Sequence, residues 1–109
     1  MAVTSPFGSQ SRTRLLIALE LLGQTYPREL ARLLGSSLSA TQKGLASLER
    51  DGIVVGRSVG RTRMVQLNPG YFALKEVRAL LGRLVEADRE LESRIAELRR
   101  RPRKAGKRL

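Results

Sequence analysis

The sequence predicts a mainly helical fold with one small β-hairpin and a long C-terminal helix. Apolar residues recur at helical spacing along most of the chain, whereas residues 53–67 change to the β-branched and alternating pattern of short strands. The core must be aliphatic, because only two Phe, two Tyr and no Trp are present, and the many leucines favour helices. The 109 residues suffice for one compact domain.

The first helix is expected after a short N-terminal arm. Residues 1–10 are small and polar, with Pro6 and Gly8, and this composition predicts a flexible arm. Ser11 is a suitable N-cap for a helix over residues 12–22, and Gly23 ends it as a left-handed residue would. Apolar residues cover most of the circumference of this helix, which predicts burial on most sides and a second chain over part of it.

Two short helices follow with a tight turn between them. Pro27 suits the first position of the second helix, and Gly35 ends it. Ser37 is the expected N-cap of a third helix over residues 38–50, which stops at Gly52. The buried face of the third helix is expected to comprise Thr41, Leu45 and Leu48.

A hairpin and a long helix complete the predicted order. A strand over residues 53–55, a turn at 58–60 and a return strand over 61–67 form the hairpin. Helical periodicity then resumes from Tyr71, with spacings that alternate between three and four residues, as in a heptad repeat. Residues 70–101 are therefore expected to form one dimerisation helix, and 102–109 a disordered basic tail. The heptad positions are Leu74, Val77, Leu81, Leu84, Asp88, Leu91, Ile95 and Leu98.

Composition argues against enzymes, metal proteins and membrane proteins. The chain has no Cys and no His, which removes disulfides, the usual zinc ligands and the commonest general base. No nucleophile, base and orienting group can be assembled without them, so we expect neither catalysis nor a cofactor nor a metal. No apolar run approaches a membrane span, and no signal peptide is visible, so a cytoplasmic, nucleoid-associated protein is expected.

The charge balance points to a polyanionic partner but does not by itself establish nucleic-acid binding. Lys and Arg number 21 against 10 acids, which gives a net charge of +11. Such an excess is typical of nucleic-acid-binding proteins. Seven of the positive charges lie in residues 99–109, so a basic tail on an ordinary domain would explain much of the excess equally well. The order of the elements is the stronger argument.

Helix, short helix, tight turn, helix and hairpin make a helix-turn-helix with a wing. The segments PRELARLLGSSLSATQKGLASLERDGIV and GRTRMVQLNP resemble winged helix-turn-helix regulators of the ArsR and MarR kind. The resemblance covers residues 12–69, and it implies a dimeric, operator-binding transcriptional regulator, with residues 11–69 as the DNA-binding domain. We expect a repressor. Metal-sensing ArsR-like members use Cys and His ligands, which this chain lacks, so a thiophilic metal signal is not expected.

The predicted DNA contacts come from the third helix and the wing. The helix over residues 38–50 is expected in the major groove, with Gln42 on adenine and Lys43 on guanine or phosphate. The wing over residues 53–67 is expected on the minor groove or the phosphate backbone. Gly44 either allows close approach to the DNA backbone or is simply tolerated in the helix. The remaining candidate contacts are Ser37 and Ser39 on phosphate, Arg57, Arg61 and Arg63 on the wing, and, on a weaker argument, Arg12, Arg14 and Arg28 at helix starts. An ordinary solvated polar face is the alternative.

The heptad predicts a homodimer, with antiparallel packing favoured because parallel packing sets Asp88 against its own copy. The alternative is a helix folded back on its own domain. For the whole protein, the other functions considered are a protein–protein adaptor and a basic RNA- or ribosome-associated protein. No aromatic platform for stacking bases is evident, which argues against RNA. The predicted dimer interface comprises Leu15, Leu19, Leu81, Leu84, Asp88, Leu91 and Ile95.

Overall fold

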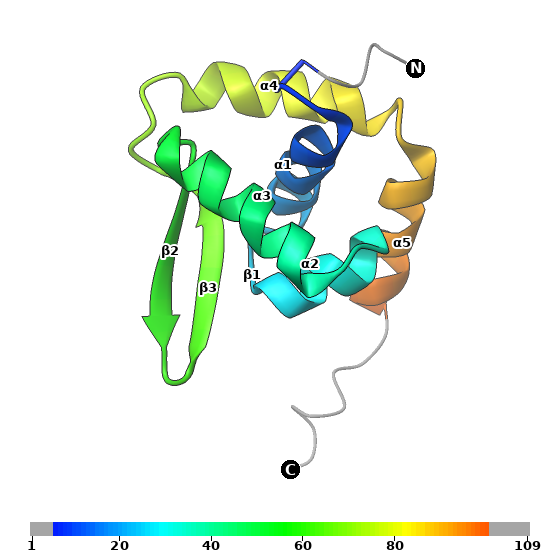
Figure 1. Ribbon diagram of the computed structural model, residues 1–109. Helices are drawn as coiled ribbons and strands as arrows, with labels where there is room; N and C mark the ends of the chain where they lie inside the picture. Colours follow the sequence, from blue (N-terminus) through cyan, green and yellow to red (C-terminus); the bar gives the residue numbers. More distant parts are fainter. Residues whose placement is uncertain (1–5, 101–109) are drawn as a thin grey trace.

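The computed structural model describes residues 6–100, and Figure 1 shows their arrangement. The fold is mainly helical with a small antiparallel sheet, as the sequence predicts. Residues 1–5 of the expected N-terminal arm and the whole expected tail lie outside the described residues. In chain order the elements are α1 (Gln10–Leu22), β1 (Gln24–Thr25), α2 (Pro27–Leu34), α3 (Leu38–Arg50), β2 (Val54–Val59), β3 (Thr62–Leu67), α4 (Leu74–Val85) and α5 (Arg89–Arg100).

The sheet has three strands in the order β1-β3-β2, all antiparallel. The hairpin pairs Val54 with Leu67 at its base and Val59 with Thr62 near its tip, where Gly60 adopts a left-handed φ of 66°. The first hairpin strand is thus longer than expected, and the turn comes later. β1 was not predicted, because a pair of residues carries no alternation pattern.

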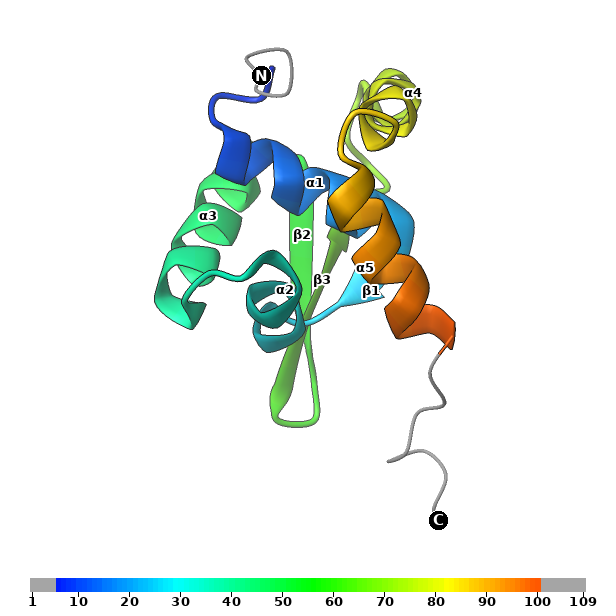
Figure 2. The same ribbon diagram turned by 90° about the vertical axis from the view of Figure 1, so that its right-hand side faces the viewer.

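Helix α1 is the centre of the fold. It begins at Gln10, earlier than expected, because Ser9 and not Ser11 is its N-cap: the Ser9 Oγ accepts a hydrogen bond from the Arg12 amide at 3.1 Å. α3 lies on one side of α1, and α4 and α5 lie on the other (Figure 2). One chain therefore buries α1 on most sides, and the second chain expected over it is not needed for that burial.

The local signals around α2 and α3 are confirmed. Pro27 occupies the first turn of α2, and Gly35 ends that helix with a left-handed φ of 67°. Ser37 caps α3, since its hydroxyl accepts a hydrogen bond from the Ala40 amide at 3.0 Å. The three residues predicted to form the buried face of α3 are buried: Thr41, Leu45 and Leu48.

Gly44 lies where α3 crosses α1. A Cβ on Gly44 would stand 2.7 Å from Cδ1 of Leu15, which is buried in the core. Glycine therefore lets the two helices approach closely. Neither reading of Gly44 offered by the sequence, approach to a DNA backbone or simple tolerance, describes this contact.

Gly44 and Gly82 provide a matched test of this contact. A Cβ on Gly82 in α4 would meet no heavy atom within 4 Å, so Gly82→Ala should raise the free energy of unfolding by about 0.5–1 kcal/mol. Gly44→Ala should give no such gain. The methyl group would overpack against Leu15 at a cost of about 1–3 kcal/mol, which offsets the gain from the better helix propensity of alanine. Urea unfolding measures both. Equal stabilisation by the two variants would contradict the contact.

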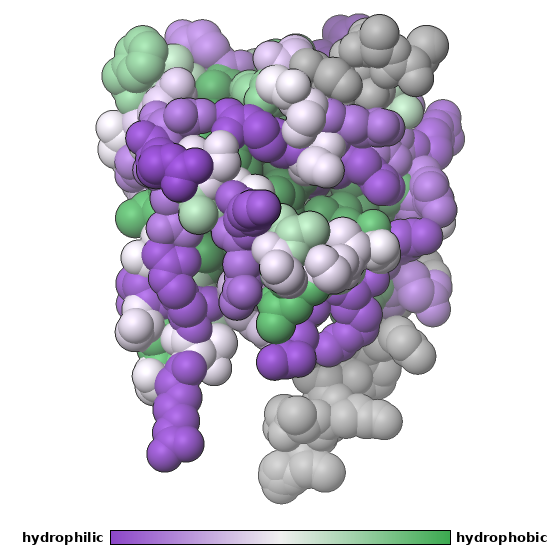
Figure 3. Space-filling model, viewed as in Figure 1, coloured by the Kyte–Doolittle hydropathy of each residue, from purple (hydrophilic) through white to green (hydrophobic). Residues whose placement is uncertain are grey.

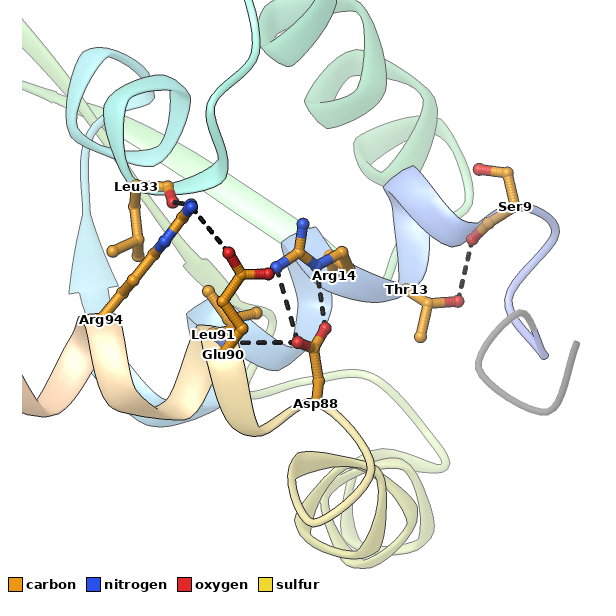
Figure 4. A network of polar contacts seen from close by, with 8 residues as sticks. All are labelled: Ser9, Thr13, Arg14, Leu33, Asp88, Glu90, Leu91 and Arg94. Atoms are coloured by element: carbon orange, nitrogen blue, oxygen red, sulfur yellow. Dashed lines mark hydrogen bonds and ion pairs between the residues drawn. The ribbon is translucent and has the colours of Figure 1, made fainter. Parts of the chain in front are cut away.

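The prediction of one continuous C-terminal helix is wrong, because the chain breaks between α4 and α5 at Asp88 (Figure 4). The Asp88 carboxylate accepts a hydrogen bond from the Leu91 amide at 3.2 Å and so caps α5. The same carboxylate pairs with Arg14 of α1, with 2.8 Å between Nε and Oδ2. An aspartate held by both contacts starts a new helix instead of continuing the old one.

The predicted dimer interface is wrong for the same reason. Its apolar residues are buried within one chain, and Asp88 is bound to Arg14 instead of facing a partner. α5 packs against α1 and α2, where Arg94 donates to the Leu33 carbonyl oxygen at 2.7 Å. The helix folded back on its own domain is the arrangement observed, and a homodimer stays a prediction without this interface. The apolar residues concerned are Leu15, Leu19, Leu81, Leu84, Leu91 and Ile95.

Candidate functional site

The outer face of α3, defined as the side turned away from α1, is polar, and no other described element covers it. It carries two of the predicted contact residues, Gln42 and Lys43, at exposed positions. Arg50 lies near Lys43 on the same helical face, since seven residues make almost two full turns. Small residues complete the face, so the helix backbone is accessible to a large partner. These residues are Ser39 and Ala46.

The start of α3 is also exposed. Ser37 uses its hydroxyl oxygen as an acceptor for the helix cap, which leaves its hydroxyl hydrogen available to an outside acceptor. Ser36 shares a hydrogen bond with the buried Thr41, with 2.9 Å between the hydroxyl oxygens. The turn is therefore anchored to α3 while Ser37 faces solvent.

A groove of about 680 Å³ separates α3 from the hairpin, and we call it the α3–hairpin groove. It brings Gln42 of α3 together with two predicted contact residues of the hairpin, Arg61 and Arg63. Arg28 from the start of α2 lines it as well. Ser37, Ser39, Lys43 and Arg57 are exposed but do not line it. In Figure 3, which views this side, hydrophilic residues lie along the hairpin among neutral and hydrophobic ones, and one hydrophilic residue projects at its tip.

Arg63 has a structural partner that the sequence did not indicate. Its guanidinium donates two hydrogen bonds to the Glu49 carboxylate of α3, at 2.8 and 2.6 Å. These bonds raise the pKa of Arg63 above its ordinary value, against the opposing effect of desolvation. Gly56 leaves room for this geometry, because a Cβ there would lie 2.6 Å from the Arg63 Cζ. Arg63 thus ties the hairpin to α3, and a glycine within a strand was the available sign of such a close approach.

The two acids between residues 38 and 67 are both neutralised. Glu49 pairs with Arg63, and Asp51 pairs with Arg12 at 2.6 Å. Arg12 and Arg14, the latter bound to Asp88, are therefore committed to protein partners and not to the phosphate contacts considered for them.

Four cations on α3 and the hairpin have no partner in the part of the chain that the structure describes. Among residues 6–100, no hydrogen bond or ion pair takes up any of them. The surface thus offers unpaired positive charge on two elements that flank the α3–hairpin groove, and this arrangement suits a large anion. The four are Lys43, Arg50, Arg57 and Arg61.

Residues 6–100 contain no group of three or more metal-ligating side chains that could hold an ion. None of the helices described is long and apolar enough to cross a membrane. No family model matches the chain, and no curated protein matches it. The geometry and charge of α3 and the hairpin are therefore the observations that bear on function.

Proposed function

We propose that the protein is a winged helix-turn-helix regulator that binds double-stranded DNA and represses transcription. In this proposal α2, the turn at Gly35 and α3 are the helix-turn-helix, and the β2–β3 hairpin is the wing. The observation that carries the proposal is the set of four cations on α3 and the hairpin that have no partner within the described residues, 6–100. Such a regulator would act in the cytoplasm, at the nucleoid.

The outer face of α3 would enter the major groove, which is wide enough for one helix. Gln42 can form two hydrogen bonds to an adenine edge, and Lys43 can reach guanine or a phosphate. Ala46 has no side chain long enough to hold the helix away from the bases. The N-terminal end of α3, with Ser37 and Ser39, would lie against phosphate, where a helix N-terminus favours an anion.

The wing would contact the backbone or the minor groove through Arg57 and Arg61. Arg63 would have a different role from the one expected for it, because it is bound to Glu49. By joining β3 to α3, it would keep the wing at a set distance from the helix that reads bases. A rigid spacing between two contact elements reduces the conformational entropy that is lost when they bind.

Selection of bound sequences from random double-stranded DNA tests the proposal. We expect an enriched motif and an affinity that falls steeply with salt. Gln42→Ala should relax the preference at one base position and cost about 1–3 kcal/mol on the selected site. Gln10→Ala, an exposed change on α1, is the matched control and should leave both unchanged.

Two results would overturn the proposal. The absence of any enriched motif, with no salt-dependent affinity for DNA, would favour a protein–protein adaptor. Preferential binding of single-stranded RNA in the same assay would favour an RNA-associated protein.

A further inference from the structure

The α3–hairpin groove has features of a small-molecule site that the proposed DNA contacts do not use. Its volume of about 680 Å³ lies within the range of about 300–1,000 Å³ that is typical of ligand pockets. The start of α2 forms a third wall, since α2 packs against α3 and β3 and its first residues lie beside the hairpin and below α3 in Figure 1. Tyr26 and Arg28 line the groove from this wall.

The lining of the groove is positively charged, and no acid belongs to it among the described residues. Arg28 and Arg61 come from different walls, and neither has a hydrogen bond or ion pair among residues 6–100. Arg63, the third cation, is held by Glu49, which does not line the groove. Arg28 also lies in the first turn of α2, where a cation opposes the helix dipole and an anion beside it is favoured. The groove therefore suits a ligand with several negative charges.

The uncharged part of the lining suits a flat ring with hydrogen-bonding groups. Tyr26 is half-buried, and its hydroxyl has no partner among residues 6–100. Pro27 and Leu38 add apolar surface to the lining. Gln42 ends in a carboxamide, which can donate to and accept from the same edge of an adenine. The groove thus combines a surface for a base with cations for phosphates.

We propose that the α3–hairpin groove binds a free nucleoside triphosphate with an adenine base. The phosphates lie between Arg28 and Arg61, and the base lies against Tyr26 with its edge on Gln42. Duplex DNA offers similar phosphates, but its bases are paired and stacked, so only a free nucleotide places a base in the groove. The proposal goes beyond DNA binding, because the nucleotide needs no duplex.

Isothermal titration calorimetry of the full chain with ATP, without DNA and without Mg²⁺, measures this binding. We expect one ATP per chain and a Kd of about 100 µM or lower at about 0.1 M salt. Adenosine lacks the phosphates and inorganic tripolyphosphate lacks the base, so each should bind at least about tenfold more weakly than ATP. GTP presents two acceptors where adenine presents a donor and an acceptor, and it should bind at least about fivefold more weakly.

Two arginine variants separate the groove from net charge. Arg28→Ala removes one of the two unpaired cations of the lining and should weaken ATP binding at least about tenfold. Arg57→Ala removes the same charge from an exposed hairpin residue that does not line the groove, and it should change the Kd by less than about twofold. Circular dichroism checks that both variants fold, which their exposed positions favour.

Tyr26→Leu tests the base. Loss of stacking should weaken ATP binding at least about fivefold and leave tripolyphosphate binding unchanged. A variant that fails to fold would show as lost circular dichroism, and GTP discrimination by the unmodified chain then provides the test of the base.

The proposal is overturned if ATP fails to bind up to about 1 mM, if tripolyphosphate binds as tightly as ATP, if GTP binds equally well, or if the two arginine variants weaken binding equally. None of these measurements uses DNA, so their failure is distinct from failure of the proposed function. One consequence does rest on that function. If the selected duplex depends on Gln42, ATP should release it in a fluorescence anisotropy titration, and ATP bound alongside the duplex would place the nucleotide outside the groove.

Discussion

Replacing both Arg57 and Arg61 by alanine is expected to weaken binding to the selected DNA site roughly fiftyfold per protomer at about 0.1 M monovalent salt. Both arginines are exposed on the hairpin and have no partner among residues 6–100, so each can neutralise a phosphate and release a counterion. The slope of log affinity against log salt should flatten by about two, while the selected sequence motif is kept. A salt titration by fluorescence anisotropy measures both quantities.

The matched control removes the same charge from the other side of the molecule. Lys75→Ala with Arg89→Ala takes two exposed cations from α4 and α5. We expect this control to change DNA affinity by less than about threefold at the same salt, since charges farther than a Debye length are largely screened. If the control and the wing variant lost affinity equally, the net charge of the chain and not the wing would account for binding.

Leu91→Ala is expected to cause the largest loss of stability among the variants described, about 2–5 kcal/mol. Leu91 is 0% exposed and joins α5 to the core of its own chain, so truncation removes buried contacts and leaves a cavity. Leu80→Ala on the outer face of α4 makes the same chemical change at a 41% exposed position and should cost less than about 1 kcal/mol. Urea unfolding monitored by circular dichroism gives both values.

The dependence of this loss on protein concentration separates burial within one chain from burial between chains. If α5 packs on its own domain, the cost of Leu91→Ala should be the same at about 2 µM and about 200 µM protein. A cost that appears only at high protein concentration would place Leu91 in an interface between two chains. It would contradict the packing of α5 on its own domain.

Elements whose signals are local could be predicted from the chain without its tertiary structure. α2 and α3 have the bounds and caps expected from Pro27, Gly35 and Ser37, because each of these residues acts within one turn of its own helix. The hairpin follows equally from β-branched residues on either side of a glycine turn. The exposed Gln42 and Lys43 were also recognisable, since helical periodicity separates them from the buried Leu45 and Leu48.

Tertiary structure alone decided which surface buries each apolar stripe and which charges are left free. A heptad pattern states that one side of a helix must be covered, but its own domain and a second chain cover it equally well. Asp88 caps α5 through the nearby Leu91 amide, but its second partner, Arg14, lies 74 residues away and reaches the carboxylate only in the folded chain. The local sequence does not distinguish Arg63 from its neighbours Arg57 and Arg61. Only the packing of the hairpin against α3 places Arg63 beside Glu49. Ion pairs between distant segments depend on the positions of both backbones, and no local pattern in the chain encodes those positions.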